Sequence, residues 1–513
     1  MFSYYPVHTS SKETCVSELE NQMQVRIDKL KKIRELGINP YPYSFKRTHT
    51  IDQLHANFQP LSEKEETISI CGRLVAFRRQ GKTAFANIKD TGGKIQIYCR
   101  QDGIGEKAYE VFKLLDYGDF IGVTGKAFST HTGEPSVLVQ QFELLSKAIR
   151  PLPIPKEKMG ENGQKVVYDE FKDLELRSRM RAVDLALNDP TMELFKKRTK
   201  IIQTVRGYLI DHGYMEVETP TLQSVYGGAS ARPFITHHNA LNLDLYLRIS
   251  NELYLKRLVV GGMERVFEFV KDFRNEGIDS THNPEFTQVE FYEAYADYNG
   301  MMEHFENIYS SACQAINGTM KISFGGKEID LTPPWERLTM YEALQKYANI
   351  DITALCDDEI KALLKKHAIE PKGAYVRGLA VAALFEALCE DKLVQPVFII
   401  DHPRETTPLC KPCRNDPTLV ERFEPYINCW EVGNAYSELN DPVLQKQLLQ
   451  EQVERGRGGE EETHPMDDDF VRSLEFGMPP TGGVGIGVDR MVMLLTNTQN
   501  IRDIILFPLM KPE

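Results

Sequence analysis

Long hydrophobic runs are absent from this 513-residue sequence, and no apolar stretch reaches the length needed to cross a bilayer. Met1 to Ser11 lacks the positive region and apolar core of a secretory signal, and it also lacks the Arg-rich amphipathic pattern of an organelle transit peptide. We therefore expect a cytoplasmic protein with no membrane partner.

The pattern of the nine cysteines contains neither a disulfide framework nor a complete zinc motif. Their irregular spacing is typical of reduced thiols in an intracellular chain. Cys410 and Cys413 form one CxxC pair, but a zinc site usually needs a second pair, and only Cys429 lies nearby. The sequence also lacks the GxGxxG and GxxxxGK[ST] loops, so neither a Rossmann site nor a P-loop is indicated.

The sequence has fewer positively than negatively charged residues, and its net charge is −13. This argues against a protein that binds nucleic acid through bulk charge alone. A nucleic-acid partner is still possible, because a polyanion needs only a local basic surface.

The N-terminal part of the chain contains a helix and then a set of short strands. Residues 1–60 form a predicted helical segment, because apolar residues recur at helical spacing over residues 16–36. Residues 61–149 hold five short strands with turn signals between them. This pattern favours a five-stranded barrel of the OB-fold type, whose face binds oligonucleotides.

The rest of the chain predicts a linker and a larger domain. Residues 150–180 are rich in Pro, Gly and charge, as linkers are. Residues 181–513 open with a predicted helix near 191–212, followed by strand-like segments and a mostly helical insertion at about 340–395. Residues 456–469 predict an exposed acidic loop. The fold class is therefore a multidomain α+β protein.

Three segments resemble the motifs of class II aminoacyl-tRNA synthetases. Glu216–Leu222 (EVETPTL) is similar to motif 1, Phe273–Glu276 with His282–Phe286 to motif 2, and Gly483–Arg490 (GVGIGVDR) to motif 3. The resemblance covers about residues 25–510. It implies an OB-fold barrel followed by an antiparallel-sheet catalytic domain flanked by helices. Four further segments resemble the lysine-specific branch of this class, namely 227–241, 252–262, 281–298 and 421–441.

This resemblance implies an enzyme that activates L-lysine with ATP, with Mg²⁺ as cofactor, and transfers it to tRNA(Lys). The attacking carboxylate is already an anion, so catalysis consists of positioning and of neutralising phosphate charge. Arg274 and Arg490 are the implied catalytic residues, and the planar fork of Arg274 suits a bridge between the α-phosphate and the lysine carboxylate. On a continuous strand, Arg274 and Glu276 would share a face.

Other residues are implied to hold ATP and the metal ion. Phe286 and Arg490 would sandwich the adenine by stacking and cation–π contact. Glu424 and Glu431 are expected on a hairpin with its turn near Asn428, facing each other, and a magnesium ion would offset their repulsion. The implied ATP-binding set is Arg274, Glu276, His282, Asn283, Phe286, Glu424, Glu431 and Arg490.

A lysine side chain requires buried carboxylates, because an unpaired buried ammonium is very costly. The resemblance places Glu290 and Glu438 near that ammonium, and Gly228 and Glu252 at the α-amino end. The implied lysine-binding set is Gly228, Glu252, Arg274, Glu290, Tyr292, Asn434, Tyr436 and Glu438. One departure from the family lies beside these residues, because Ser250-Asn251 stands where relatives usually have Ala-Pro.

In the barrel, Phe85, Gln96 and Glu134 match positions that read anticodon bases in the family. An aromatic platform for an unpaired base is expected of RNA-binding barrels. The motif 1 resemblance also implies a homodimer, with the long helix and the Pro220 segment at the interface.

Two other functions stay open at this point. A lysine ligase with a protein acceptor would lack the anticodon barrel, whereas this sequence predicts one. A non-catalytic RNA-binding or signalling protein would be expected to have lost its catalytic residues, yet Arg274, Glu424, Glu431 and Arg490 are all present. Lysine-dependent ATP–pyrophosphate exchange separates the binding protein from both enzymes.

Overall fold

The computed structural model describes residues 9–153, 156–159, 165–168, 171–370, 374–457 and 464–512. The chain divides into two compact units, Met1–Asp173 and Leu174–Glu513. Within the described residues, no helix combines the length and apolar character needed to span a membrane.

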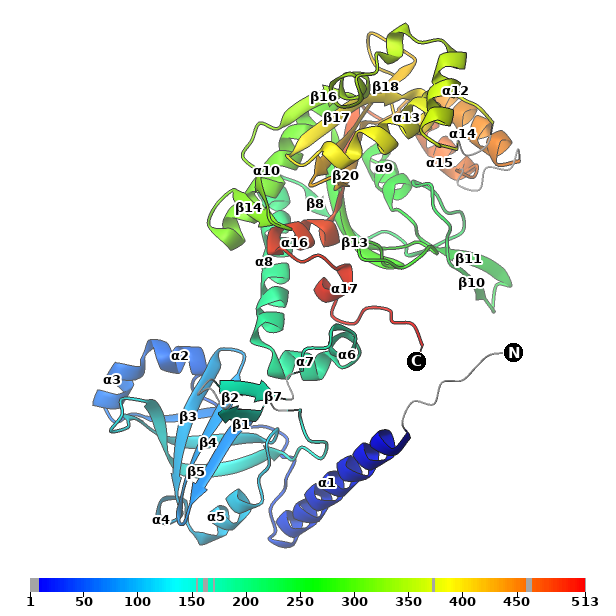
Figure 1. Cartoon of the computed structure of the whole chain (residues 1–513). Coiled ribbons are helices and arrows are strands. Elements are labelled where there is room, and N and C mark those ends of the chain that lie inside the picture. Colours follow the sequence, from blue (N-terminus) through cyan, green and yellow to red (C-terminus); the bar gives the residue numbers. More distant parts are fainter. Residues whose placement is uncertain are drawn as a thin grey trace. The chain divides into compact units, whose positions relative to one another are not determined.

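The first unit contains a closed five-stranded barrel, drawn in blue to cyan in Figure 1. Its strands follow the order β1-β2-β3-β5-β4, and inward and outward side chains alternate along β2 and β3. Inward apolar residues such as Ile88, Ile97 and Val123 fill the interior. The predicted OB-fold is confirmed. The bounds are β1 Thr67–Gln80, β2 Thr83–Asp90, β3 Gly93–Arg100, β4 Phe120–Ser129 and β5 Pro135–Ser146.

Helices accompany the barrel. The helix predicted over residues 16–36 belongs to α1, which spans Thr9–Glu35. The amphipathic helix α5, Glu106–Lys113, connects β3 to β4 and buries Tyr109 and Phe112 in the barrel core. The shorter helices are α2 Ile51–Ala56, α3 Phe58–Glu63 and α4 Gln101–Ile104.

Two segments predicted to be irregular are only partly described. Within the predicted linker, β6 (Lys156–Met159) pairs with β7 (Lys165–Tyr168), and residues 160–164 between them lie outside the described part. Of the predicted acidic loop, residues 458–463 likewise lie outside it, between α14 (Pro442–Arg457) and α15 (Asp468–Glu475).

The second unit is built on a nine-stranded sheet in the order β16-β17-β18-β20-β21-β13-β12-β8, with β19 paired to β18. Most pairs are antiparallel, and only β16·β17 and β12·β8 are parallel. The antiparallel catalytic sheet predicted from the resemblance is confirmed. The bounds are β8 Met215–Glu216, β12 Arg265–Phe273, β13 Glu285–Ala294, β16 Glu336–Thr339, β17 Val397–Pro403, β18 Leu419–Ile427, β19 Trp430–Glu431, β20 Gly433–Ser437 and β21 Thr481–Gly487.

Three helices cover one face of this sheet (Figure 1). The sheet side chains that meet them are apolar, including Val289, Phe291 and Ile486. Because strand side chains alternate, Gln288, Glu290 and Tyr292 on β13 turn to the other face, where the cavity lies. The three helices are α8 Asp189–Asp211, α10 Tyr298–Asn317 and α16 Val488–Thr496.

Smaller elements complete this unit. The segment predicted as a helical insertion contains α11, α12 and α13, which bury a small core against β17 and β18. Helix α9 begins at Glu252 and packs beside β13. The bounds are β9 Leu222–Gln223, β10 Ile235–His238, β11 Leu243–Leu247, α6 Leu174–Arg179, α7 Arg181–Leu187, α9 Glu252–Val260, α11 Met340–Ala343, α12 Asp357–Lys366, α13 Arg377–Leu388, β14 Lys321–Phe324, β15 Lys327–Asp330 and α17 Ile501–Ile504.

Candidate active site

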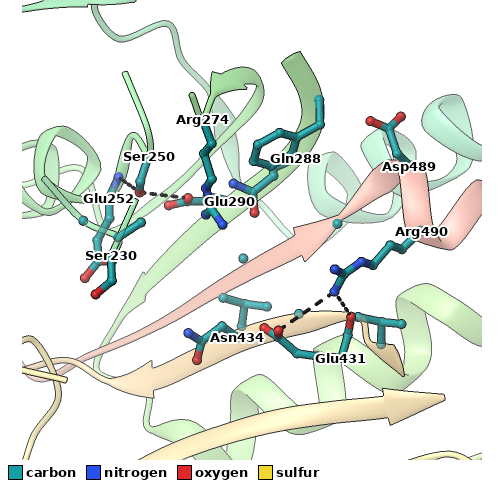
Figure 2. Close-up of a pocket in the computed structure, with 18 of the residues that line it drawn as sticks. Ser230, Ser250, Glu252, Arg274, Gln288, Glu290, Glu431, Asn434, Asp489 and Arg490 are labelled. Carbon is teal, nitrogen blue, oxygen red and sulfur yellow. Dashed lines mark hydrogen bonds and ion pairs between the residues drawn. The ribbon is translucent and has the colours of Figure 1, made fainter. Parts of the chain in front are cut away.

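A cavity of about 390 Å³ lies over the middle of the sheet (Figure 2). Its lining comes from β13, β20 and β21, from the loop after β12, and from the start of α9. Nearly all the catalytic-unit residues predicted from the sequence meet here, and Glu424 is the exception. Those in the lining are Gly228, Glu252, Arg274, Glu276, His282, Asn283, Phe286, Glu290, Tyr292, Glu431, Asn434, Tyr436, Glu438 and Arg490.

The floor of the cavity is a strand of alternating glycines. Glu290 on β13 pairs with Gly485 on β21, and Tyr292 pairs with Gly483. On the other side of β21, Asn434 and Tyr436 of β20 pair with the same two glycines. Two polar strands therefore flank a stretch of β21 from Gly483 to Gly487 that has no side chains on this face, which leaves room for a ligand.

Gly483 is packed so closely by its neighbours that no larger residue fits there without a shift. A Cβ atom there would lie 2.1 Å from Glu438 Oε1 and 2.5 Å from Tyr292 Cε1. At Gly485 the nearest protein atom would be 3.6 Å away, an ordinary contact. The segment that resembles motif 3 begins at this residue, but the sequence alone did not show that Gly483 is packed more tightly than Gly485.

Glu290 is a buried carboxylate at the inner end of the cavity. Its Oε1 accepts a hydrogen bond from the Ser250 hydroxyl at 3.2 Å, and its Oε2 accepts one from the Tyr292 hydroxyl at 3.1 Å. Burial, followed by the nearby charges of Asp272 and Glu252, raises the pKa of Glu290 well above its usual value. A bound cation would relieve the cost of ionising this group.

Lys256, which sequence reasoning missed, lies under the same region. Its fully buried Nζ is 2.6 Å from Glu252 Oε1 and also contacts Glu438 Oε2. Burial lowers the pKa of Lys256, but the charges of Glu252 and Glu438 outweigh it, so the pKa is raised. Glu438 Oε1 is buried without a hydrogen-bond partner among the described residues. Glu290 and Glu438 are therefore not equivalent, because only Glu438 is already paired with a protein cation.

At the outer end, Arg274 and Glu276 do not sit on a strand. Strand β12 ends at Phe273, and both residues lie in the loop beyond it, where the Glu276 amide donates to the Arg274 carbonyl at 2.9 Å. The prediction of a shared strand face was wrong. The guanidinium of Arg274 instead lies over the Phe286 ring, 5.1 Å from its centre.

Arg490 reaches across the cavity from the first turn of α16. Its guanidinium donates to the Glu431 carbonyl and lies 3.9 Å from the Glu431 carboxylate (Figure 2). It also approaches His282 Nε2 at 3.2 Å. His282 is held in turn by Asp279, at 2.8 Å from Nδ1. Arg490, His282 and two carboxylates, those of Glu431 and Asp279, thus lie together at the mouth of the cavity.

The predicted hairpin is present, but its two glutamates do not face each other. Asn428 and Cys429 both have positive φ, as a two-residue hairpin turn requires, and Glu431 pairs with Tyr426. Glu424 precedes Tyr426 by two residues on β18 and lies on the same face of the strand. It contacts Arg422 and accepts a hydrogen bond from the Tyr426 hydroxyl at 3.0 Å. The predicted pairing was off by two residues.

The two carboxylates still form a negative patch suited to a divalent cation. Burial and then the charge of Glu424 raise the pKa of Glu431. Burial also raises the pKa of Glu424, but Arg422, His402 and the Tyr426 hydroxyl together outweigh it, so the pKa of Glu424 is lowered. Carboxylate oxygens are the ligands that Mg²⁺ prefers, and it commonly uses only one or two, together with substrate phosphates. Among the described residues, no group of three or more His, Cys, Asp or Glu is arranged to hold a metal ion.

The barrel carries a second, separate groove. Phe85, Gln96 and Glu134 all line it, together with Arg78 and Tyr117. The Phe85 ring stacks on Tyr98, with centres 4.6 Å apart. The three residues predicted to read bases therefore surround one concavity that has an aromatic wall.

Comparison with known proteins is consistent with both sites. Residues 173–511 match the family model of class II tRNA synthetases (D, K and N), and residues 68–145 match that of the OB-fold nucleic acid binding domain. The lysine--tRNA ligase of Clostridium botulinum (strain Hall) is 47% identical over 513 residues, covering 98% of this chain and 99% of that protein. The lysine--tRNA ligase of Thermoanaerobacter sp. (strain X514) is 47% identical over 498 residues, covering 97% of each.

Proposed function

The chain belongs to the class II tRNA synthetases of the D, K and N group, and from this premise we propose that it ligates lysine to tRNA. It activates L-lysine with ATP to give lysyl-adenylate and pyrophosphate, and it then transfers lysine to the 3′-terminal adenosine of tRNA(Lys). The observation that carries the choice of lysine is Glu290, a buried carboxylate in the cavity that accepts hydrogen bonds, within the described part of the chain, from two neutral hydroxyls.

The inner end of the cavity would hold the side chain of lysine. The ammonium would lie between Glu290 and the free Oε1 of Glu438. Burial without a partner of opposite charge is costly for the ammonium and for the carboxylates alike. Tyr292, Asn434 and Tyr436 would line its methylenes and supply the remaining polar contacts. A site built on paired charges strongly rejects amino acids with neutral side chains.

The α-amino group would lie near Gly228 and Glu252, at the start of α9. The positive φ of Gly228 lets its backbone turn close to this end of the cavity. The lysine carboxylate would then point toward Arg274. From there it would attack the α-phosphorus of ATP directly, because a carboxylate anion needs no general base.

The outer end would hold ATP. Phe286 and Arg490 would take the two faces of the adenine, so Arg490 must leave its contacts with Glu431 and His282 when the nucleotide binds. His282 and Asn283 would contact the outer phosphates, and Glu276 the adenine. Arg274 would hold the α-phosphate and the lysine carboxylate in a line, which is the main catalytic contribution available here.

Glu424 and Glu431 would hold Mg²⁺ together with the phosphates of ATP. When bound, the ion would neutralise phosphate charge and orient the triphosphate. The two carboxylates repel each other, and this repulsion favours a bound cation. Arg422 limits that repulsion at Glu424.

The barrel groove would bind the anticodon. Phe85 would stack on an unpaired base, and Gln96 and Glu134 would read base edges through hydrogen bonds. This groove favours a tRNA acceptor over a protein acceptor.

We further propose a cytoplasmic homodimer. Large apolar side chains are exposed along the end of α8 and the segment after it, namely Ile210, Met215, Leu222, Ile235 and Leu243. A second copy of the chain would cover them, and light scattering of the purified protein would report twice the chain mass. The described cysteines are all free thiols, which fits a reducing compartment.

ATP–pyrophosphate exchange with each of the twenty amino acids tests the proposed function. We expect exchange with lysine well above the other nineteen, followed by charging of a tRNA transcript with a UUU anticodon. Exchange without charging would support the protein-acceptor alternative. Absence of lysine-dependent exchange would reject lysine activation altogether.

A further inference from the structure

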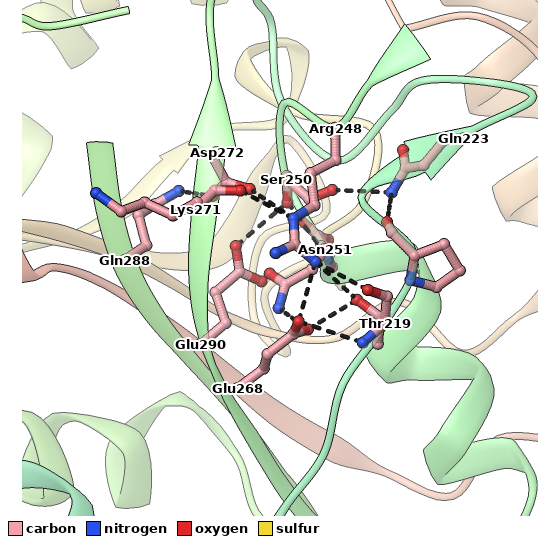
Figure 3. A network of polar contacts seen from close by, with 12 residues as sticks. Thr219, Gln223, Arg248, Ser250, Asn251, Glu268, Lys271, Asp272, Gln288 and Glu290 are labelled. Atoms are coloured by element: carbon pink, nitrogen blue, oxygen red, sulfur yellow. Dashed lines mark hydrogen bonds and ion pairs between the residues drawn. The ribbon is translucent and has the colours of Figure 1, made fainter. Parts of the chain in front are cut away.

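The loop between β11 and α9 carries a dense polar network behind the cavity (Figure 3). The buried Arg248 contacts Glu268 at 2.9 Å, and the Asn251 amide donates to the other oxygen of Glu268 at 2.7 Å. Between these two residues, Ser250 turns the other way, toward Glu290. The loop thus fixes its own backbone through Glu268 and presents a single hydroxyl to the cavity.

Ser250 touches three residues that the proposed function assigns to lysine. Its hydroxyl donates to Glu290 Oε1 at 3.2 Å and accepts from the backbone amide of Glu252 at 3.1 Å (Figure 2). It also packs against Gly228, where a Cβ atom would lie 2.7 Å from Ser250 Oγ. Ser250 is itself only 5% exposed, so water has little access to replace these bonds.

The hydrogen bonds of Ser250 and Tyr292 orient the Glu290 carboxylate. Each of its oxygens accepts one bond from a hydroxyl, which leaves the remaining lone pairs for the ligand. Removal of the Ser250 hydroxyl would free Oε1 and would also leave the Glu252 amide without this acceptor. Both ends of the amino-acid site would then lose a contact at once.

We propose that Ser250 is a positioning residue that sets lysine affinity by holding Glu290, Glu252 and Gly228 in one arrangement. The inference rests on the proposed function and extends it. The usual family pattern has alanine at this position, so that pattern assigns no role to a hydroxyl there. Ser250 acts through its neighbours, so its effect falls on lysine binding more than on the chemical step.

The test is Ser250→Ala in the full-length protein, assayed by ATP–pyrophosphate exchange over a range of lysine concentrations. A hydrogen bond to a buried charge is strong enough that we expect the KM for lysine to rise about tenfold. The kcat is expected to stay within about threefold, and the KM for ATP is expected not to change. Equal losses in kcat and in both KM values, with a lower melting temperature, would overturn the proposal in favour of a structural role.

Two further variants sharpen the result. Ser250→Thr keeps the hydroxyl and is expected to restore the wild-type KM for lysine; if it melts normally yet behaves like Ser250→Ala, side-chain packing rather than the hydroxyl is responsible and the proposal is wrong. Ser310→Ala removes a hydroxyl that is equally buried, on α10 and outside the cavity, and is expected to leave both KM values unchanged. Wild-type exchange with lysine is measured first, so a failed proposed function is distinguished from a failed role for Ser250.

Discussion

Five buried carboxyl groups surround two buried cations beneath and beside the cavity. Arg248 pairs with Glu268 at 2.9 Å and lies 3.8 Å from Asp272, and Lys256 pairs with Glu252 and Glu438. Glu290 has no ion pair with a cation among the described residues. The excess negative charge is what a cationic substrate would neutralise. At the scale of single residues, lysine affinity and stability therefore depend on the same charges.

Lys256→Met should destabilise the protein more than any loss of surface charge. It leaves Glu252 and Glu438 buried without their cation, and breaking a buried pair in this way costs roughly 3–5 kcal/mol. Urea unfolding measures the change. Lys361→Met, which removes an exposed ion pair with Asp358, is the control and should cost less than about 1 kcal/mol. Equal effects of the two variants would show that the buried pairs matter little.

Asp272→Asn should change how stability depends on pH. Burial raises the pKa of Asp272 to about 6 from 3.8, even though Gln288 donates to it at 2.6 Å. Between pH 3.8 and 6, the folded state still holds a proton on Asp272 that the unfolded state has released. The stability that this proton contributes is therefore lost as pH rises through this window. Above pH 6 the variant should be more stable than wild type by about 2–3 kcal/mol. Urea unfolding at several pH values measures this, and parallel curves for the two proteins would contradict it.

Gly483→Ala should damage lysine binding. The added Cβ would lie 2.1 Å from Glu438 Oε1, and the Tyr292 ring blocks relief on the other side. We expect the KM for lysine in the exchange assay to rise by tenfold or more, which is ~1.4 kcal/mol of binding. Gly300→Ala on α10, where a Cβ meets nothing within 4 Å, should bind lysine normally. A normal KM for Gly483→Ala would mean that the pocket can widen.

At the scale of elements, the hairpin of β18 and β19 matters because its register sets the distance between two glutamates. Glu431 faces Tyr426, and Glu424 lies two residues further along and is tied to Arg422. The two carboxylates are close enough to repel without meeting head-on. If the two glutamates hold a metal ion as proposed, Glu431 would be the more available ligand, because Arg490 approaches its carboxylate only at 3.9 Å.

Glu431→Gln should therefore weaken the response to Mg²⁺. The Mg²⁺ concentration for half-maximal exchange is expected to rise about tenfold, or ~1.4 kcal/mol of ion binding. Exchange measured over a Mg²⁺ titration at fixed ATP reports it. Glu328→Gln, an exposed position on β15, should titrate like wild type. If Glu431→Gln also titrates like wild type, the ion is held elsewhere.

At the scale of the whole molecule, the chain has two units with separate hydrophobic cores. The cavity proposed to bind lysine and ATP is lined by residues of one unit, and the aromatic groove by residues of the other. Under the proposed function, activation of lysine would use the cavity of one unit, and charging would also use the groove of the other.

Phe85→Ala should separate these two steps. Loss of one stacked base costs ~1–3 kcal/mol, so the KM for tRNA in charging should rise on the order of tenfold. Lysine-dependent exchange without tRNA should be unaffected, because Phe85 belongs to the other unit. A fall in exchange itself would contradict the independence of the two sites, and unchanged charging would reject Phe85 as a base platform.

The sequence by itself determined the two folds and most of the residues around the cavity. Alternating strand patterns predicted the barrel, and alternation along β13 put Glu290 and Tyr292 on one face, because strand geometry is local. Motifs kept in order along the chain were enough to bring Arg274 and Arg490 to one site. These features depend on neighbouring residues or on whole segments.

Only the tertiary structure decided how the charges pair and where close packing occurs. Lys256 meets Glu438, a residue far along the chain, and Gly483 packs against that same carboxylate. The hairpin register that offsets Glu424 from Glu431, and the strand end that leaves Arg274 in a loop, were likewise invisible in residue patterns. Ion pairs and steric contacts act over a few ångströms between distant segments, so they exist only once the chain has folded.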